Sequence, residues 1–177
     1  MCRKTIVFIA SSLDGFIAGP DDNLSFLDLV AKEGEDYGYA AFMSNIDTVV
    51  LGRKTYDWVM KQVPVFPHAD RESYVITRTA KPAQGKTVFY TGNPVTLVKE
   101  LAQKEGKNIF IDGGAELINS LLKAQQVDEI YLSVIPVILG DGVRLFHTGN
   151  PMQVSKLVST KQFSTGLVQL HYVLTKP

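Results

Sequence analysis

Cysteine is almost absent from the chain, since Cys2 is the only one among 177 residues. A single thiol cannot form an internal disulfide, and the three histidines, His68, His147 and His171, are too widely separated to make a zinc-ligand pattern. We therefore expect no metal site and no disulfide framework, which is typical of a protein of the reducing cytoplasm. The histidines are interpreted as structural or surface residues.

Net charge of either sign is also missing, because 18 Lys and Arg residues balance 18 Asp and Glu residues. A neutral chain has no general attraction for nucleic acid or for an anionic membrane, so any anion site has to be local. The apolar runs are much shorter than the roughly 20 residues that cross a bilayer, and the run Ile6–Ala10 reads as a strand, not as a signal segment. We expect a soluble protein with neither nucleic acid nor membrane as its partner.

The chain has no internal repeat, no low-complexity tract and no linker that divides it. With 177 residues, of which 45% are apolar, it is long enough for one sizeable core and short for two. The sequence therefore predicts a single domain over residues 1–177.

Strand-like and helix-like segments alternate along the first three quarters of the chain, which favours a mostly parallel sheet with helices on both faces. A long loop over 12–24 contains turn-forming pairs with apolar anchors between them. Near the C-terminus, Val154–Phe163 and Leu167–Thr175 surround Ser164-Thr165-Gly166 and predict an antiparallel hairpin. The predicted strands begin near residues 5, 47, 73, 87, 108 and 127. The predicted helices lie within 35–45, 52–63 and 94–104, and a further one is marked by Leu117, Ile118, Leu121 and Leu122.

The segment Leu51-Gly52-Arg53-Lys54-Thr55 lies where a buried strand gives way to a helix. Free backbone amides at a helix N-terminus attract phosphate, glycine allows close approach, and two adjacent cations add charge. This pattern indicates an anchor for a dinucleotide. The alternative is that Arg53 and Lys54 are ordinary solvated residues of a first helical turn.

Two further segments also have residues that suit a nucleotide phosphate. Asn108–Ala115 is a strand that ends in Gly113-Gly114 before a helix, which suits a pyrophosphate but also suits a simple tight turn. Ile76–Thr79 offers hydroxyls and the Arg78 guanidinium at a strand end, which suits a 2′-phosphate but also an ordinary surface. The G-x-G-x-x-G fingerprint is missing after the first strand, so a dinucleotide would have to bind to a fold other than the Rossmann fold.

Segments in three parts of the chain together resemble the dihydrofolate-reductase superfamily. Ile9–Ala18, Leu51–Tyr56 and Ile111–Leu117 are similar to landmarks of that superfamily and follow in the same order. The downstream segments Val127–Ile130 and Pro136–Gly142 resemble, more specifically, the reductase domain of bifunctional riboflavin-biosynthesis deaminase-reductases. No deaminase half accompanies them in this sequence.

The resemblance implies a three-layer α/β/α fold of the dihydrofolate-reductase type and an oxidoreductase that uses NADPH. It implies phosphate contacts at the first helix start, 2′-phosphate contacts at a strand end, pyrophosphate contacts at the glycine pair, and a nicotinamide near the first strand. The loop from Asp14 to Leu24 corresponds to a mobile flap over the cofactor. The implied cofactor residues are Gly52, Arg53, Lys54 and Thr55, then Thr77 and Arg78, then Gly113, Gly114 and Ala115, and finally Ala10, Leu13 and Ile17.

Hydride addition to a C=N bond also needs a proton for the nitrogen, and two carboxyl groups are candidates. Counting back from Gly52 places Asp36 in register with the helix carboxylate of dihydrofolate reductases, although a charged residue in a first helical turn is also ordinary. Asp14 lies beside the expected nicotinamide position, although aspartate before Gly15 is also a common turn former. Both candidates stay open.

The implied reaction is reduction of a pyrimidine- or pteridine-like small molecule, and the closest named activity is reduction of 5-amino-6-(5-phosphoribosylamino)uracil. Dihydrofolate reduction is one alternative, and a non-catalytic NADPH-binding module is another. Because related reductases are commonly dimers, we also expect a homodimer, with the strand after Gly142 and the segment Pro136–Leu139 pairing across a two-fold axis.

Overall fold

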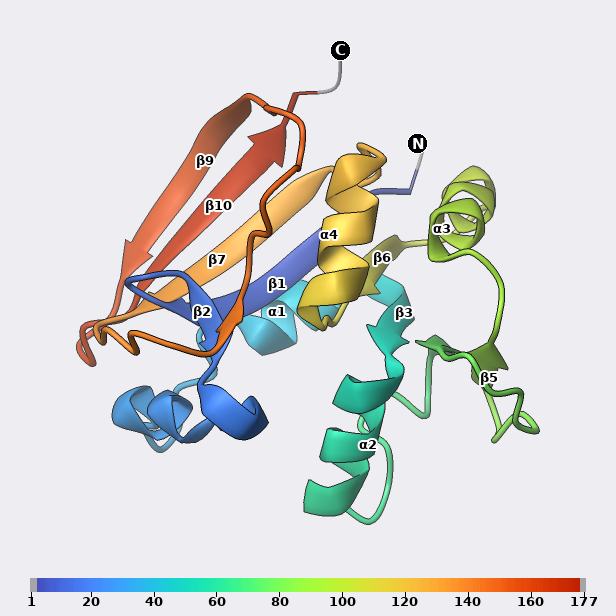
Figure 1. The fold of residues 1–177 in the computed structure, drawn as a ribbon, viewed down its shortest axis with the longest axis horizontal. Coiled ribbons are helices and arrows are strands. Elements are labelled where there is room, and N and C mark those ends of the chain that lie inside the picture. Colours follow the sequence, from blue (N-terminus) through green and yellow to red (C-terminus); the bar gives the residue numbers. More distant parts are fainter. Residues whose placement is uncertain (1–2, 176–177) are drawn as a thin grey trace.

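The computed structural model describes residues 3–175, so Cys2, the residue behind the expected lack of a disulfide, lies outside the described part. The fold is built on an eight-stranded sheet in the order β5-β4-β3-β6-β1-β7-β10-β9 (Figure 1). Six of these strands run parallel, and β10 is antiparallel to both of its neighbours. The predicted mixed, mostly parallel sheet with a C-terminal antiparallel hairpin is confirmed.

The main sheet strands are β1 Thr5–Ser12, β3 Ile46–Gly52, β4 Glu72–Ile76, β5 Thr87–Tyr90, β6 Asn108–Ile111, β7 Glu129–Ile135, β9 Ser155–Gln162 and β10 Val168–Leu174. The α-helices are α1 Tyr39–Met43, α2 Arg53–Gln62, α3 Pro94–Gln103 and α4 Ala115–Lys123. The short elements are β2 Phe16–Ala18, β8 Val143–Arg144 and the 3-10 helices η1 Pro20–Asp22 and η2 Ser25–Val30.

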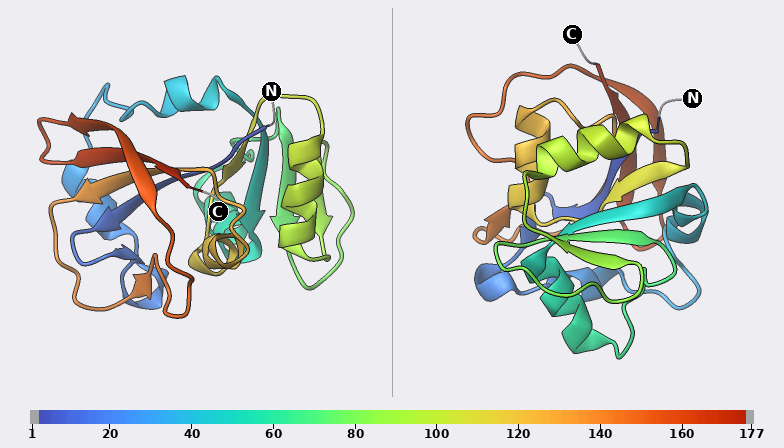
Figure 2. Two further views of the ribbon diagram at one scale, coloured as in Figure 1. Left: turned by 90° about the horizontal axis from the view of Figure 1, so that it is seen from above. Right: turned by 90° about the vertical axis from the view of Figure 1, so that its right-hand side faces the viewer.

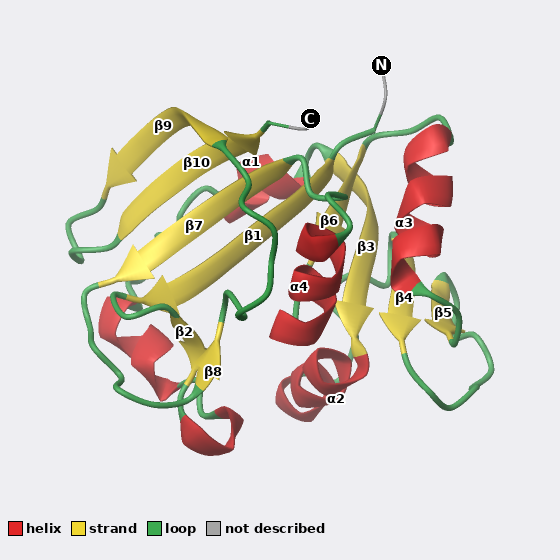
Figure 3. Cartoon of the chain, turned by 45° about the horizontal axis from the view of Figure 1, so that its top comes forward, coloured by secondary structure: helices red, strands yellow, loops and turns green. Residues whose placement is uncertain are grey.

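The helices cover the sheet on both faces, as a three-layer fold requires. In Figure 3, α3 and α4 lie in front of the sheet and α1 lies behind it, and Figure 2 shows the same arrangement from two other sides. One core cluster packs α3 and α4 against β1, β3 and β6, and a second packs α1 and α2 against the opposite face. No helix among residues 3–175 is long and apolar enough to span a membrane.

The central strands are apolar on both faces because each face meets a helix. Val49, Val50 and Leu51 of β3 are fully buried, and so are Ile109 and Ile111 of β6. Such β-branched runs pack well on a pleated surface and leave no solvated side. The ends of these strands are therefore held firmly, which matters for the residues that follow them.

The helix expected within residues 35–45 is much shorter than the pattern indicates. Tyr37 and Gly38 both have positive φ, at 55° and 81°, so helical geometry begins only at Tyr39. The Asp36 carboxylate accepts hydrogen bonds from the Gly38 and Ala40 amides, which fixes this turn. The preceding chain instead forms η2, whose Phe26 and Val30 pack under the hairpin.

The loop over residues 12–24 contains a strand that periodicity does not predict. β2 pairs antiparallel with β8, the two-residue strand after Gly142. The segment expected to pair across a two-fold axis therefore has a partner within its own chain. In the hairpin, all eight residues of β9 are exposed, so the alternation of polar and apolar residues in its sequence does not correspond to a buried face.

The backbone of Gly142 lies against the backbone of Ala18 and Gly19. A Cβ at this position would lie 2.1 Å from the Ala18 carbonyl oxygen, and its φ is +136°. We expect Gly142→Ala to lower the free energy of unfolding by about 2 to 4 kcal/mol, because backbone has to move. The measurement is urea unfolding followed by circular dichroism.

Gly140→Ala is the matched control, since Gly140 also has a positive φ of +77° but has nothing within 4 Å of its Cβ position. That change costs only the backbone conformation, about 1 kcal/mol. Equal losses for the two variants would contradict the close contact at Gly142.

Candidate functional site

The carboxyl ends of β3 and β6 are joined directly where each strand meets a helix. The Gly52 amide donates a hydrogen bond of 2.7 Å to the Gly113 carbonyl oxygen. A Cβ at Gly52 would lie 3.5 Å from the Gly114 nitrogen, at ordinary van der Waals distance, so the two segments are in direct contact. Gly113 has a φ of +94°, and the Gly113–Gly114 peptide bond is cis. The two predicted phosphate segments therefore lie side by side at one edge of the sheet.

This junction places two helix N-termini next to each other. Gly52 is the N-cap of α2 and Gly114 is the N-cap of α4, and neither cap supplies a side-chain hydrogen bond to the first turn. The first amides of both helices therefore stay available to an anion, and both helix dipoles favour negative charge there. Two adjoining phosphates of a dinucleotide match this arrangement.

The cations of the first α2 turn differ in their present contacts. Arg53 forms an ion pair of 2.7 Å with Asp57, one turn further along the helix. Lys54 is exposed and has no ion pair with any residue between 3 and 175. Thr55 is half-buried, and its hydroxyl would lie 3.6 Å from a Cβ at Gly114. Lys54 is thus the freer of the two cations.

Thr77 and Arg78 follow directly after β4, the next strand outward from β3. The Thr77 amide donates to Tyr90, and its hydroxyl oxygen accepts from the Thr79 amide at 3.2 Å. Arg78 is exposed and has no described ion pair. Both residues thus lie at the same carboxyl edge as Gly52, one strand further along.

The residues expected near the nicotinamide lie on β1 and the loop after it. Ala10 is opposite Ser133 in the ladder between β1 and β7. Leu13 is 61% exposed, and its amide donates to the Val137 carbonyl oxygen. Ile17 lies in β2 and packs against the core cluster on the α4 face. Ala10 and Ile17 therefore pack against different core clusters.

Asp14 ties the loop after β1 to residues 136–142. Its carboxylate accepts hydrogen bonds from the Ser12 hydroxyl at 2.6 Å and from the amides of Leu139 and Gly140 at 3.1 and 2.7 Å. The Ser12 hydrogen bond, followed by the backbone amides, lowers the pKa of Asp14 to about 2. An acid with this pKa is ionised at neutral pH, so the contacts suit a loop anchor.

Asp36, the other acid candidate, is exposed. The backbone hydrogen bonds from Ala40 and Gly38 lower its pKa below the ordinary value. It therefore stabilises the start of α1. The roles of Asp14 and Asp36 as proton donors stay predictions.

The comparison with known families now identifies the chain. The model of the RibD C-terminal domain matches residues 3–169. The chain belongs to this family. The chain therefore resembles the reductase domain of bifunctional riboflavin-biosynthesis deaminase-reductases and falls within the dihydrofolate-reductase-like superfamily.

Individual proteins are similar to the chain over nearly its full length. The uncharacterized protein YwjB of Bacillus subtilis strain 168 is 44% identical over 98% of this chain and 99% of its own length. A Shewanella sp. PV-4 protein named for riboflavin biosynthesis is 30% identical, covers 99% of this chain and 100% of its own, and has a TM-score of 0.87. The dihydrofolate reductase of Enterococcus faecalis, solved with NADP(H), is 19% identical with a TM-score of 0.66 over 98% of this chain and 97% of its own. The last likeness concerns the fold alone.

The fold of this RibD C-terminal domain brings together three polar residues that no sequence motif connects. Asp112 lies at the end of β6, and its Oδ2 is 3.7 Å from Nε2 of His68, a buried residue on the loop after α2. Tyr39 of α1 lies close enough that the charge of Asp112 contributes to the raised pKa of its phenol, after the larger effect of burial. His68 and Asp112 are far apart in sequence and share no motif, so only the fold brings them together.

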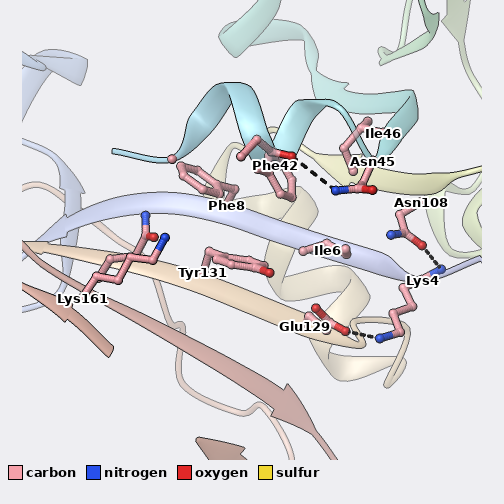
Figure 4. A pocket seen from close by; sticks show the side chains of 13 residues that line it. Lys4, Ile6, Phe8, Phe42, Asn45, Ile46, Asn108, Glu129, Tyr131 and Lys161 are labelled. Carbon is pink, nitrogen blue, oxygen red and sulfur yellow. Dashed lines mark hydrogen bonds and ion pairs between the residues drawn. The ribbon is translucent and has the colours of Figure 1, made fainter. Parts of the chain in front are cut away.

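Two cavities lie away from the predicted cofactor residues. The first, about 310 Å³, lies between α1 and the strands β1 and β7 and is lined by Phe8, Phe42 and Tyr131 with Lys4 and Lys161 at its ends (Figure 4). The second, about 340 Å³, lies on the opposite face beside Phe146 and Tyr172. No cluster of potential metal ligands occurs among residues 3–175.

The low pKa of Asp14 gives a pH-dependent prediction. A carboxyl group whose pKa is lower in the folded state than in the unfolded state stabilises the fold, and this stabilisation is complete above the unfolded-state pKa of about 4. The stabilisation is lost as the pH falls through the folded-state pKa. We expect wild type to be more stable than Asp14→Asn at pH 7, and the difference in melting temperature to narrow below pH 4. Asp28→Asn, at an exposed position, is the control and should change little. A difference that is constant with pH would contradict the anchoring role of the Asp14 carboxylate.

Proposed function

We propose that the protein is an NADPH-dependent reductase of a pyrimidine- or pteridine-like small molecule. The observation that carries this proposal is the junction of Gly52 and Gly113, where two uncapped helix N-termini adjoin at the carboxyl edge of a parallel sheet. Ligands of open α/β sheets bind at this edge, and adjoining helix N-termini suit a pyrophosphate. Membership of the RibD C-terminal domain family supports the same reading.

In this proposal the α2 start at Gly52–Thr55 and the segment Gly113–Ala115 hold the phosphates of NADPH, and Thr77 and Arg78 hold the 2′-phosphate. Ala10, Leu13 and Ile17 lie beside the nicotinamide, and the loop from Asp14 to Leu24 excludes water. The bound cofactor supplies a hydride. The protein contributes orientation of the two reactants and a proton for the substrate, without a covalent intermediate.

The cofactor assignment predicts a specific loss in Arg78→Ala. Removing a guanidinium that pairs with a phosphate costs roughly 1.5 to 3 kcal/mol, so the affinity for NADPH should fall about 10- to 100-fold while the affinity for NADH stays nearly the same. The fluorescence of Trp58, which lies on α2, reports the titration, with calorimetry as a check. Lys99→Ala, an exposed lysine on α3, is the matched control. Equal losses for both nucleotides would remove the 2′-phosphate assignment.

The substrate assignment is tested by turnover. We expect oxidation of NADPH with 5-amino-6-(5-phosphoribosylamino)uracil, followed at 340 nm, and slower oxidation or none with dihydrofolate. The reverse order would favour dihydrofolate reduction. Tight NADPH binding without turnover on either compound would favour a non-catalytic NADPH-binding module.

We also propose that the protein works in the cytoplasm as a homodimer. Because β8 already pairs with β2, a two-fold contact at residues 136–144 has to use side chains such as Ile138, which is 72% exposed. Sedimentation at micromolar concentration should show a species of twice 19.5 kDa. A species of 19.5 kDa alone would remove the dimer.

A further inference from the structure

Helix α1 covers only part of the sheet face on which it lies. Because Tyr37 and Gly38 have positive φ, the helix is limited to the five residues Tyr39–Met43. Phe8 of β1 and Tyr131 of β7 therefore stay only half-buried, and the space beside them is the cavity of about 310 Å³ in Figure 4. Ligand pockets range from about 300 to 1,000 Å³, so this cavity suits a small molecule of one or two rings.

Aromatic rings form the walls in the middle of this cavity. The rings of Phe8 and Tyr131 are stacked, with 24° between their planes and 5.7 Å between their centroids. Phe42 of α1 lies 4.7 Å from the Phe8 ring and 5.6 Å from the Tyr131 ring. Tyr131 also stacks on His171 at 3.9 Å, which fixes its orientation. Such preformed aromatic walls favour a planar aromatic molecule, because ring contacts stabilise it beyond the burial of its area.

The charges at the Lys4 end of the cavity are already paired. Glu129, whose side chain is 7% exposed, forms an ion pair with Lys4 Nζ through one carboxylate oxygen. Its other oxygen accepts a hydrogen bond of 2.9 Å from His171 Nε2. Burial would raise the pKa of Glu129, but the hydrogen bonds from Lys4 and His171 outweigh burial and lower it. A charged ligand group therefore meets no open charge at this end.

Lys161 of β9 supplies an open positive charge at the other end of the cavity (Figure 4). A Cβ at Gly38 would lie 3.9 Å from the Lys161 Nζ, so the ammonium group reaches the start of α1. Within residues 3–175, Lys161 makes neither an ion pair nor a hydrogen bond. Its charge helps to lower the pKa of Asp36, but the Asp36 carboxylate accepts the amides of Gly38 and Ala40 instead. The unpaired charge that faces the cavity is thus positive.

We propose that this cavity is a second ligand site, which takes a planar aromatic molecule that carries one carboxylate. The rings of the ligand lie against Phe8, Phe42 and Tyr131, and its carboxylate contacts the ammonium group of Lys161. The site goes beyond the proposed reductase function and does not depend on it, because none of its lining residues is among those assigned to NADPH.

The test is calorimetric titration with probes that share one ring system, 2-naphthoate, neutral 2-naphthamide and cationic 2-naphthylmethylammonium. We expect 2-naphthoate to bind most tightly. Lys161→Gln should weaken its binding about three- to five-fold, as expected for a partly exposed ion pair, and should leave 2-naphthamide nearly unchanged. Lys161→Arg should keep the preference for the carboxylate. Lys156→Gln, an exposed lysine of β9 outside the cavity lining, is the matched control and should bind like wild type.

The aromatic wall is tested separately from the charge. Tyr131→Leu keeps an apolar side chain but removes the ring, so it should weaken 2-naphthoate and 2-naphthamide alike, by about two- to ten-fold. Tyr131→Phe keeps the ring and should bind both probes like wild type. Amide NMR spectra show that each variant is folded, and in wild type 2-naphthoate should shift the amides of Gly38, Ala41 and Phe42.

Four outcomes would overturn the proposal. The first is no heat and no shifted amide at millimolar 2-naphthoate. Equal affinity for all probes, or equal losses in Lys161→Gln and Lys156→Gln, would remove the role of the charge. Shifts confined to the residues around Phe146 and Tyr172 would place the probe in the other cavity. Competition between 2-naphthoate and 5-amino-6-(5-phosphoribosylamino)uracil would make the cavity part of the reductase substrate site.

Discussion

The hydrogen bond between the Gly52 amide and the Gly113 carbonyl oxygen is the constraint on which the site depends. It joins the ends of two neighbouring parallel strands and thereby brings the starts of α2 and α4 together. The buried β-branched strands hold this edge rigid, while the two helix dipoles give it a local positive potential in a chain with no net charge. The proposed anion site of this neutral protein thus depends on backbone geometry more than on side-chain charge.

The carboxylates near this edge divide according to what they bind. Asp14 and Asp36 accept backbone amides and stay ionised, so they shape the loop after β1 and the start of α1. Asp112 faces the His68 imidazole, and its charge contributes to the raised pKa of the Tyr39 phenol. Asp14 and Asp36 therefore differ from Asp112 in the number of backbone donors around the carboxylate, which is one determinant of its pKa.

The sequence predicts the parts of this molecule that local patterns determine. β1, β3 and the hairpin follow from composition and turn chemistry, and the phosphate segments follow from glycine at strand ends. It does not predict the pairing of β2 with β8, because that ladder joins segments more than a hundred residues apart. It also misjudges α1, where positive φ at Tyr37 interrupts a helical pattern. It does not predict that His68 lies beside Asp112, a contact that depends on the fold.

Hydrogen exchange of the backbone amides, with and without NADPH, tests the central claim most directly. The account predicts that NADPH slows exchange at Gly52–Thr55 and Gly113–Ala115 together, because both helix starts donate to the same pyrophosphate. Protection confined to the residues around Phe8 and Tyr131, or around Phe146 and Tyr172, would place the nucleotide in one of the two cavities and contradict the account.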